Sequence, residues 1–229
     1  MTIKHVLFVC LVLVACEGPV RAQPSKPTDR SGPKRWAKAI AAFEKQDRRS
    51  PPPKNGLLFV GSSSIWLWKL DKSFPHRKAI NRGFGGSEIA DSIDYADQLI
   101  LKHKPRIVVL YAGDNDIARG KSAKRVAADF RRFVKTVHAK LPKTRILFIA
   151  IKPSIRRWKL ADTMKAANTL IADQCGKNER LDYVDVFTPM LGKDGKPRAE
   201  LFIIDGLHLN AAGYKLWASL LRPYLKKRP

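Results

Sequence analysis

The sequence predicts an α/β fold with three layers, α/β/α, around a central parallel sheet of roughly five strands. Short apolar runs alternate with longer segments of helical periodicity. Most of these runs contain only apolar residues, as expected for strands that are buried on both faces of a sheet. Polar or glycine-rich turns follow the first three runs. Within 229 residues this pattern, which contains no internal repeat, predicts a single folded domain.

The predicted elements follow one another regularly along the chain. Trp36, Ile40 and Phe43 recur at helical spacing and predict a short amphipathic helix, which a run of three prolines ends. The predicted strands are residues 57–60, 79–81, 107–111, 146–151 and 183–186. The predicted helices are residues 64–70, 87–103, 122–140, 158–177 and 211–224. Because crossovers between parallel strands are right-handed, we expect helices on both faces of the sheet.

The beginning of the chain is typical of an export signal. Lys4 and His5 precede an apolar run that is too short to span a bilayer. Small residues at Val20 and Ala22 predict cleavage after Ala22. Residues 1–22 are therefore interpreted as a signal peptide of an exported, periplasmic or extracellular protein.

The remainder divides into a linker and a domain. Residues 23–33 are polar and rich in proline, which indicates a linker, and residues 34–229 contain the predicted fold. An alternative for the N-terminus remains open, because Leu13-Val-Ala-Cys16 also resembles a lipoprotein box. In that case the protein would be anchored through a lipid on Cys16, with no transmembrane span in either case.

The charge balance indicates the kind of partner. The chain has 44 Lys and Arg against 20 Asp and Glu, a formal net charge of +24. Such an excess favours attraction to an anionic surface or an acidic polysaccharide. The sequence contains no zinc-finger spacing, no RNA-binding aromatic motif and no clear helix-turn-helix pattern, so no specific nucleic-acid partner is expected.

Neither a metal nor a cofactor is expected. After cleavage at Ala22 only Cys175 remains of the three cysteines, which leaves neither a disulfide framework nor a thiolate cluster. Glu88 stands where a dinucleotide fingerprint requires its third glycine. Ala118 and Arg119 occupy positions where a calcium loop requires a ligand and a glycine.

Asp205 and His208, three residues apart near the C-terminus, are a candidate base and its orienting carboxylate. A carboxylate can fix the tautomer of a histidine and stabilise it when protonated, so that the other ring nitrogen acts as a base. Ser63 offers a nucleophile at the other end of the chain, in the turn after residues 57–60. Because sites in open α/β sheets form at the carboxyl ends of the strands, we expect these side chains to meet.

Two further turns are predicted at the same edge of the sheet. Gly86 ends the glycine-rich turn after the second strand, and Asn115 lies in Gly113-Asp-Asn-Asp116 after the third. Backbone N–H groups and a side-chain amide in such turns can stabilise an oxyanion. Each turn by itself is also explained by a helix cap or an Asx turn. Together, in this order, they favour a catalytic site.

These four blocks resemble those of the SGNH hydrolase superfamily, also called GDSL-type esterases, lipases and acylhydrolases. The resemblance covers roughly residues 55–225. It implies a flavodoxin-like fold and a set of site residues: a triad of Ser63, Asp205 and His208, and an oxyanion hole from the backbone N–H groups of Ser63 and Gly86 and the amide of Asn115. The family's Gly-Asp-Ser reads Gly61-Ser62-Ser63 here, which leaves the role of Ser62 open.

The resemblance implies a serine ester hydrolase that works through an acyl-serine intermediate. No long lid follows the motifs, which favours a short acyl group, with acetyl preferred, on a carbohydrate or another cell-surface substrate. Residues that follow strand ends at the predicted edge are expected to border the substrate: Arg82, Lys152, Arg156 and Trp158. Two alternatives stay open, an acyltransferase with the same triad and a non-catalytic module that binds a glycan or a surface.

Overall fold

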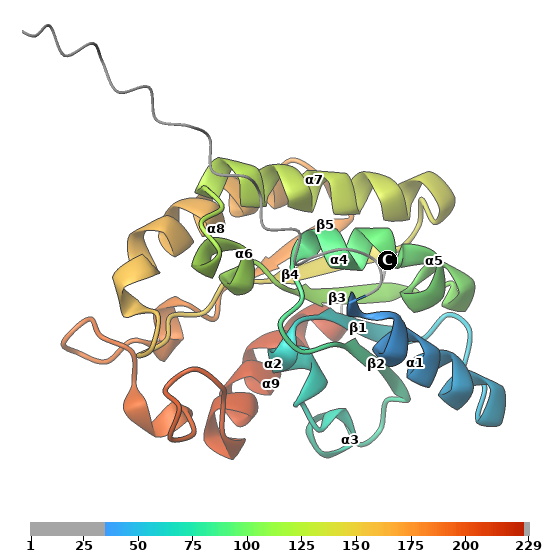
Figure 1. Ribbon diagram of the computed structural model, residues 1–229, viewed down its shortest axis with the longest axis horizontal. Coiled ribbons are helices and arrows are strands. Elements are labelled where there is room, and N and C mark those ends of the chain that lie inside the picture. The colour runs from blue at the N-terminus through green and yellow to red at the C-terminus, as the bar shows by residue number, and fades with distance from the viewer. Residues whose placement is uncertain (1–34, 227–229) are drawn as a thin grey trace, which may run out of the picture. The chain divides into compact units, whose positions relative to one another are not determined.

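A five-stranded parallel sheet forms the centre of the computed structural model, which describes residues 35–226 (Figure 1). The strands lie in the order β2-β1-β3-β4-β5 and pair in parallel throughout. Their bounds are β1 (Leu57–Gly61), β2 (Ala79–Gly83), β3 (Ile107–Tyr111), β4 (Arg145–Ile149) and β5 (Leu181–Val184). The predicted three-layer α/β fold with a parallel sheet of five strands is therefore confirmed.

Burial explains why these runs form strands. Every residue of β1, β3 and β4 is buried. When helices cover both faces of such a run, its backbone N–H and C=O groups cannot reach water. They can then form hydrogen bonds only with neighbouring strands, so the run forms part of a sheet. The outer strand β2 carries polar residues, among them Asn81 and Arg82, because it has a neighbouring strand on one side only.

Helices cover both faces of the sheet. Figure 1 shows α4, α6, α7 and α8 on one side and α2, α3 and α9 on the other. The helices are α1 (Ala37–Arg49), α2 (Ser63–Trp66), α3 (Leu70–Ser73), α4 (Ile89–Asp94), α5 (Ala96–Leu99), α6 (Asp114–Ala118), α7 (Ala123–Lys140), α8 (Ala161–Gly176) and α9 (Ala211–Lys226). Short 3-10 turns are η2 (Leu101–His103), η3 (Trp158–Leu160), η4 (Thr188–Met190) and η5 (Ala199–Leu201).

The predicted helix 64–70 is wrong in one respect, because the chain forms two short helices there. The side-chain amide of Asn81 donates to the carbonyls of Ile65 (2.7 Å) and Trp68 (3.2 Å). These bonds satisfy carbonyls at the end of α2 and allow the chain to turn. The indole of Trp68 then reaches the hydroxyl of Ser73 (2.8 Å) at the end of α3.

The predicted helix 87–103 is interrupted as well. Non-helical backbone angles at Tyr95 and Ile100 divide it into α4, α5 and η2. Ile89, Leu99 and Ile100 are all fully buried, and the two breaks turn each piece toward the core. The predicted helix 158–177 begins with a 3-10 turn, and its α-helical part is α8.

The predicted signal peptide, the alternative lipid anchor at Cys16 and the linker lie outside the described residues. Among residues 35–226, no helix combines the length and apolarity needed to cross a membrane.

Candidate active site

Ser63 begins α2 directly beyond the carboxyl end of β1. Gly61 makes this turn possible, because its φ is +131° and a Cβ there would lie 1.9 Å from the carbonyl oxygen of Tyr111. The close approach lets the backbone N–H of Ser62 donate to that same oxygen at 2.9 Å. The strand end is thereby tied to β3, and Ser63 stands at the edge of the sheet.

His208 lies between Ser63 and Asp205. Its Nε2 is 3.0 Å from Oγ of Ser63, and its Nδ1 is 2.5 Å from Oδ2 of Asp205. The structure therefore brings together three side chains that lie up to 145 positions apart in sequence. The order serine, imidazole, carboxylate is the arrangement in which an imidazole can take a proton from a hydroxyl.

The hydrogen bonds around Asp205 favour its ionised form. Partial burial raises its pKa, but hydrogen bonds from the backbone and ring of His208 and from the backbone N–H of Leu207 outweigh burial and lower the pKa to about 2. Its Oδ1 accepts from both backbone groups at 2.9 Å. The loop between the two residues thus holds the carboxylate as an anion that faces the imidazole.

Two backbone N–H groups at this edge are free to bind an oxyanion. Within residues 35–226, the N–H groups of Ser63 and Gly86 have no hydrogen-bond acceptor. Gly86 has a φ of +75°, which a residue with a Cβ rarely adopts. Its carbonyl accepts from Arg119 at 2.9 Å, which holds this turn in place.

Asn115 is held in a single orientation. Its amide Nδ2 donates to the carbonyl of Ser87 at 3.0 Å, and its Oδ1 accepts from Nη2 of Arg157 at 3.1 Å. Nη1 of Arg157 lies 3.0 Å from Oδ2 of Asp114. With Oδ1 occupied by a guanidinium, the remaining N–H of the amide is the group left to act as a donor.

The strand order explains why these donors come together. Ser63, Gly86 and Asn115 follow β1, β2 and β3, which are neighbours in the order β2-β1-β3. Because the three strands are parallel, their carboxyl ends lie at the same edge. The nucleophile candidate is on the middle strand, with one donor turn on each side.

Arg157 is a site residue that the sequence analysis missed, although its two neighbours in the chain were named. Arg156 is exposed, and its backbone N–H donates to the carbonyl of Gly206 at 3.1 Å. Trp158 is half-buried, with Nζ of Lys165 5.9 Å from its ring. In a loop without regular periodicity, the sequence does not reveal which of three adjacent side chains turns inward.

Lys152 is not placed to bind substrate, which corrects the prediction. It is buried, and its Nζ donates to the hydroxyl of Tyr111 and the carboxylate of Asp114, both at 3.1 Å. Burial lowers the pKa of Lys152, although Asp114 opposes this effect. Burial would raise the pKa of Asp114, but Lys152 and Arg157 lower it overall. Lys152 therefore neutralises a buried carboxylate beside Asn115.

Arg82 also has another role than the predicted one. Its side chain is buried, it forms an ion pair with Asp47 of α1, and it lies 5.0 Å from the ring of Phe43. A guanidinium that is enclosed by a carboxylate and an aromatic ring joins α1 to β2 and does not present its charge to a substrate. Of the four predicted substrate contacts, Arg156 and Trp158 remain as candidates.

A second buried charge cluster joins the two donor turns. Nζ of Lys121 lies 2.8 Å from Glu88, 2.8 Å from Asp116 and 3.0 Å from Asp129. Glu88 follows the Gly86 turn, Asp116 follows Asn115, and Asp129 belongs to α7. Burial raises the pKa of Asp116 to about 6, against the opposing effect of Lys121. One ammonium group therefore connects both turns to α7.

Exposed apolar side chains gather on the segments that carry the site. Trp66 is 59% exposed and lies in the helix that Ser63 begins, where its ring covers Gly85. Ile204 is 106% exposed and precedes Asp205. The other large apolar residues that are exposed in the described part of the chain are Leu67, Ile155 and Ile203. Trp66 and Leu67 lie at the end of α2, Ile203 and Ile204 precede Asp205, and Ile155 contacts Gly206.

In residues 35–226, no three His, Cys, Asp or Glu side chains are grouped so that they could hold a metal ion. Cys175, the cysteine that the structure describes, is buried, and burial together with Asp182 raises its pKa to about 12.

Several solved structures share this fold. A Streptococcus pneumonia protein provisionally assigned as a platelet activating factor has a TM-score of 0.75 at 22% identity, over 84% of this chain and 93% of its own. A GDSL-like lipase from Bacteroides thetaiotaomicron has a TM-score of 0.67 at 19% identity, over 86% and 98%. An acetylxylan esterase from Geobacillus stearothermophilus has a TM-score of 0.61 at 13% identity, over 77% and 96%.

These solved structures share the three-layer α/β fold of this chain, with its central parallel sheet. Residues 60–216, more than half of the chain, match the family model of the GDSL-like lipase/acylhydrolases. The chain belongs to the GDSL-like lipase/acylhydrolase family, and the predicted resemblance is confirmed. No curated protein sequence matches the chain.

Proposed function

We propose that this protein hydrolyses short-chain acyl esters, acetyl esters foremost, through an acyl-serine intermediate on Ser63. The observation that carries the proposal is the continuous contact from Oγ of Ser63 to Nε2 of His208 (3.0 Å) and from Nδ1 to Asp205 (2.5 Å). A serine hydroxyl is a weak nucleophile until a base removes its proton, and this contact supplies the base.

In the first half of the reaction, His208 takes the Ser63 proton as Oγ bonds to the acyl carbon. The carbonyl oxygen becomes an oxyanion, which the N–H groups of Ser63 and Gly86 and the amide of Asn115 stabilise. Each such donor is worth about 3 kcal/mol of barrier in comparable sites. His208 then gives its proton to the leaving alkoxide, the bond from carbon to that oxygen breaks, and the alcohol departs.

In the second half, water replaces the alcohol. His208 takes a proton from water as its oxygen bonds to the acyl carbon, and the acyl–Oγ bond breaks with return of the proton to Ser63. Asp205 remains an anion throughout and stabilises the imidazolium. Its lowered pKa of about 2 supports this role.

The proposed acetyl group and carbohydrate carrier have indirect support. An acetyl esterase and a carbohydrate esterase of family 3 from Talaromyces cellulolyticus share the fold, each with a TM-score of 0.59 at 17% identity. The exposed indole of Trp66 beside Gly85 offers an apolar face on which a sugar ring can stack. Arg156 and Trp158, on the loop that contacts Gly206, are proposed to border the carrier.

The proposed setting is outside the cytoplasm, in the periplasm or the extracellular space, with cleavage after Ala22. The measured mass of the secreted protein tests this, because a lipid on Cys16 would place the N-terminus elsewhere and add the mass of the acyl chains. With a charge of +24, an anionic surface or an acidic polysaccharide is the proposed partner.

The proposal is tested with p-nitrophenyl esters of increasing chain length. We expect a steep preference for acetate and a loss of at least about 10³-fold in kcat for Ser63→Ala. Ser62→Ala is the matched control, because Oγ of Ser62 is buried without a hydrogen-bond partner in the described part of the chain. Equal activity of wild type and Ser63→Ala would refute the proposed nucleophile. Acyl transfer to an added alcohol in preference to water would instead assign a transferase.

A further inference from the structure

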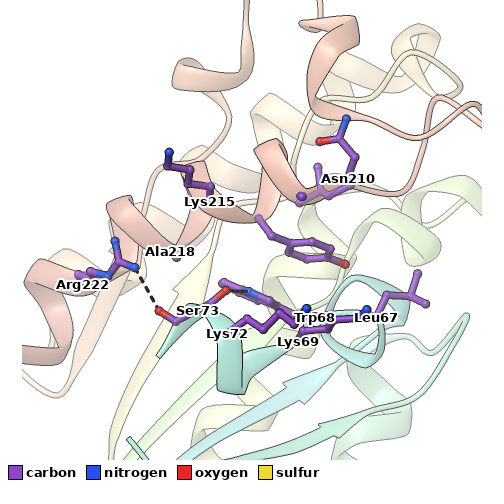
Figure 2. Close-up of a pocket in the computed structure, with 12 residues that line it drawn as sticks. Leu67, Trp68, Lys69, Lys72, Ser73, Asn210, Lys215, Ala218 and Arg222 are labelled. Atoms are coloured by element: carbon purple, nitrogen blue, oxygen red, sulfur yellow. Dashed lines mark hydrogen bonds between the residues drawn. The ribbon is translucent and has the colours of Figure 1, made fainter. Parts of the chain in front are cut away.

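A pocket of about 450 Å³ lies between α3 and α9, and its lining includes Leu209, the residue that follows His208 in the chain (Figure 2). One wall continues directly from His208 through Leu209 and Asn210, and another includes Leu67 at the end of α2. Between them, the hydroxyl of Tyr214 donates to the carbonyl of Ser64 at 3.0 Å. The pocket is therefore built on the same segments as the catalytic contact.

The charged residues that line this pocket are all cations. Lys69 and Lys72 come from α3 and the residue before it, and Lys215 and Arg222 come from α9. Figure 2 shows Lys69, Lys72 and Arg222 around the hollow, with Arg222 bonded to the carbonyl of Ser73 at 3.1 Å. The lining contains no Asp or Glu.

The neutral polar groups of the lining are already engaged. The amide of Asn210 caps α9, where its Oδ1 accepts from the backbone N–H groups of Ala212 and Gly213. Ser73 accepts from the indole of Trp68. Within residues 35–226, the side chains of Lys69, Lys72 and Lys215 have neither a hydrogen bond nor an ion pair. The side chains of this pocket that have no partner in the described part of the chain therefore include three cationic donors.

Lys69, Lys72 and Lys215 are exposed, unlike the buried and half-buried cations of the ion pairs described above. Lys121, Lys152 and Arg82 are each neutralised by carboxylates. Three exposed ammonium groups that line one hollow make its electrostatic potential positive, which favours a ligand that brings negative charge. A volume of a few hundred Å³ with the ring of Tyr214 in its lining suits a sugar unit better than a bare ion.

We propose that this pocket is a subsite for an acidic sugar, and that it binds the carboxylate of a glycan whose neighbouring unit presents the acyl ester to Ser63. The inference rests on the proposed ester hydrolysis and identifies its substrate class. Carboxylate oxygens accept from Lys69 and Lys72 on one side and from Lys215 on the other, while the sugar ring contacts Tyr214.

The test uses the triple variant Lys69→Gln/Lys72→Gln/Lys215→Gln. The matched control is Lys104→Gln/Lys140→Gln/Lys143→Gln, which removes the same charge from another basic hollow, formed by the loops that precede β3 and β4. Both are assayed on O-acetylated oligogalacturonate, on O-acetylated xylo-oligosaccharide and on p-nitrophenyl acetate. Direct binding of unacetylated oligogalacturonate is measured by calorimetry in a Ser63→Ala background, which does not depend on turnover.

We expect the pocket variant to raise KM for the acidic glycan about tenfold or more and to weaken oligogalacturonate binding by a similar factor. Its kcat on p-nitrophenyl acetate and its KM for the neutral glycan stay unchanged, and the control variant matches wild type. High salt should reduce the difference.

Several outcomes would overturn the proposal. If both triple variants lose the same affinity for oligogalacturonate, the glycan is attracted by the net charge of the protein alone and not by this pocket. If the pocket variant binds oligogalacturonate as tightly as the wild type, the subsite is refuted. Binding to phosphatidylglycerol vesicles is measured in parallel. If the wild type binds these vesicles but not oligogalacturonate, and the pocket variant loses the vesicle binding, the ligand is a lipid instead. If p-nitrophenyl acetate is hydrolysed but no acidic glycan binds, the subsite fails while the ester hydrolysis stands. Failure of every ester would refute the hydrolysis itself.

Discussion

Arg157 donates through Nη2 to Oδ1 of Asn115 at 3.1 Å, and this bond determines which end of the amide faces the proposed oxyanion. We expect Arg157→Gln to lower kcat about tenfold with little change in KM, because the amide then samples orientations that point Oδ1 toward the developing charge.

Kinetics of Arg157→Gln, Asn115→Ala and the double variant check this expectation. If Arg157 acts through Asn115, the double variant is no worse than Asn115→Ala alone. Arg180→Gln, at an arginine that precedes β5 and is half-buried like Arg157, is the control. An additive loss in the double variant would show that Arg157 contributes independently of the amide.

Asp205→Asn should reduce kcat by about 10²- to 10⁴-fold while the protein keeps its stability at neutral pH within about 1 kcal/mol. An amide cannot stabilise the imidazolium as an anion does, and it can hold the wrong tautomer of His208. Stopped-flow or steady-state assays with p-nitrophenyl acetate measure the loss, and thermal unfolding monitors the fold. A variant that keeps near wild-type kcat would remove Asp205 from the proposed triad.

Lys121→Met should destabilise the fold by at least about 3 kcal/mol, since it leaves the buried carboxylates of Glu88, Asp116 and Asp129 without their shared cation. Because the cluster joins both donor turns, kcat should fall as well. Urea unfolding measures the first effect. The control is Lys124→Met, at an exposed lysine in the first turn of α7. It is expected to change the free energy of unfolding by less than about 0.5 kcal/mol. Equal destabilisation by Lys121→Met and Lys124→Met would contradict this prediction.

Because His103 is buried, we expect the fold to lose stability in mild acid. Burial lowers its pKa to about 4, with help from Arg82 and Lys102 and against Asp47. The unfolded chain binds this proton near pH 6.5, whereas the folded chain binds it only near pH 4. The contribution of neutral His103 to the free energy of unfolding is therefore complete above pH 6.5 and is lost as the pH falls toward 4. The loss approaches about 3 kcal/mol.

Unfolding free energies measured between pH 4 and pH 7 check this prediction. The decrease of the unfolding free energy with falling pH should be smaller in His103→Gln than in the wild type. It should be unchanged in His76→Gln, the control at an exposed histidine. An unchanged slope in His103→Gln would assign the acid sensitivity to other groups.

The sequence was sufficient for the architecture because the periodicity of apolar residues is local information. Runs such as 107–111 are buried on both faces wherever they pair, so their apolar character reveals a parallel sheet before any pairing is known. The same locality explains the errors in the helices. The end of α2 depends on the amide of Asn81, which arrives from another strand, and no pattern within residues 64–70 contains that contact.

For the site, residue order within short blocks was sufficient to nominate Ser63, Gly86, Asn115, Asp205 and His208. Which of the charged side chains nearby turn inward was not encoded in those blocks. Lys152 follows a strand end as expected, whereas Arg82 lies within β2, and each forms an ion pair, Lys152 with Asp114 and Arg82 with Asp47. A charge without a local partner in the sequence can have a partner anywhere in the fold, so its exposure is decided by tertiary contacts.

By itself, then, the sequence determined the fold class, the family and the residues of the proposed triad, because these depend on local periodicity and on short motifs at strand ends. Only the tertiary structure decided that His208 reaches Ser63 at 3.0 Å, that Arg157 orients Asn115 at 3.1 Å, and that the lysines of α3 and α9 face a common pocket. Those relationships depend on the packing of helices across the edge of a sheet, where residues far apart in the chain become neighbours.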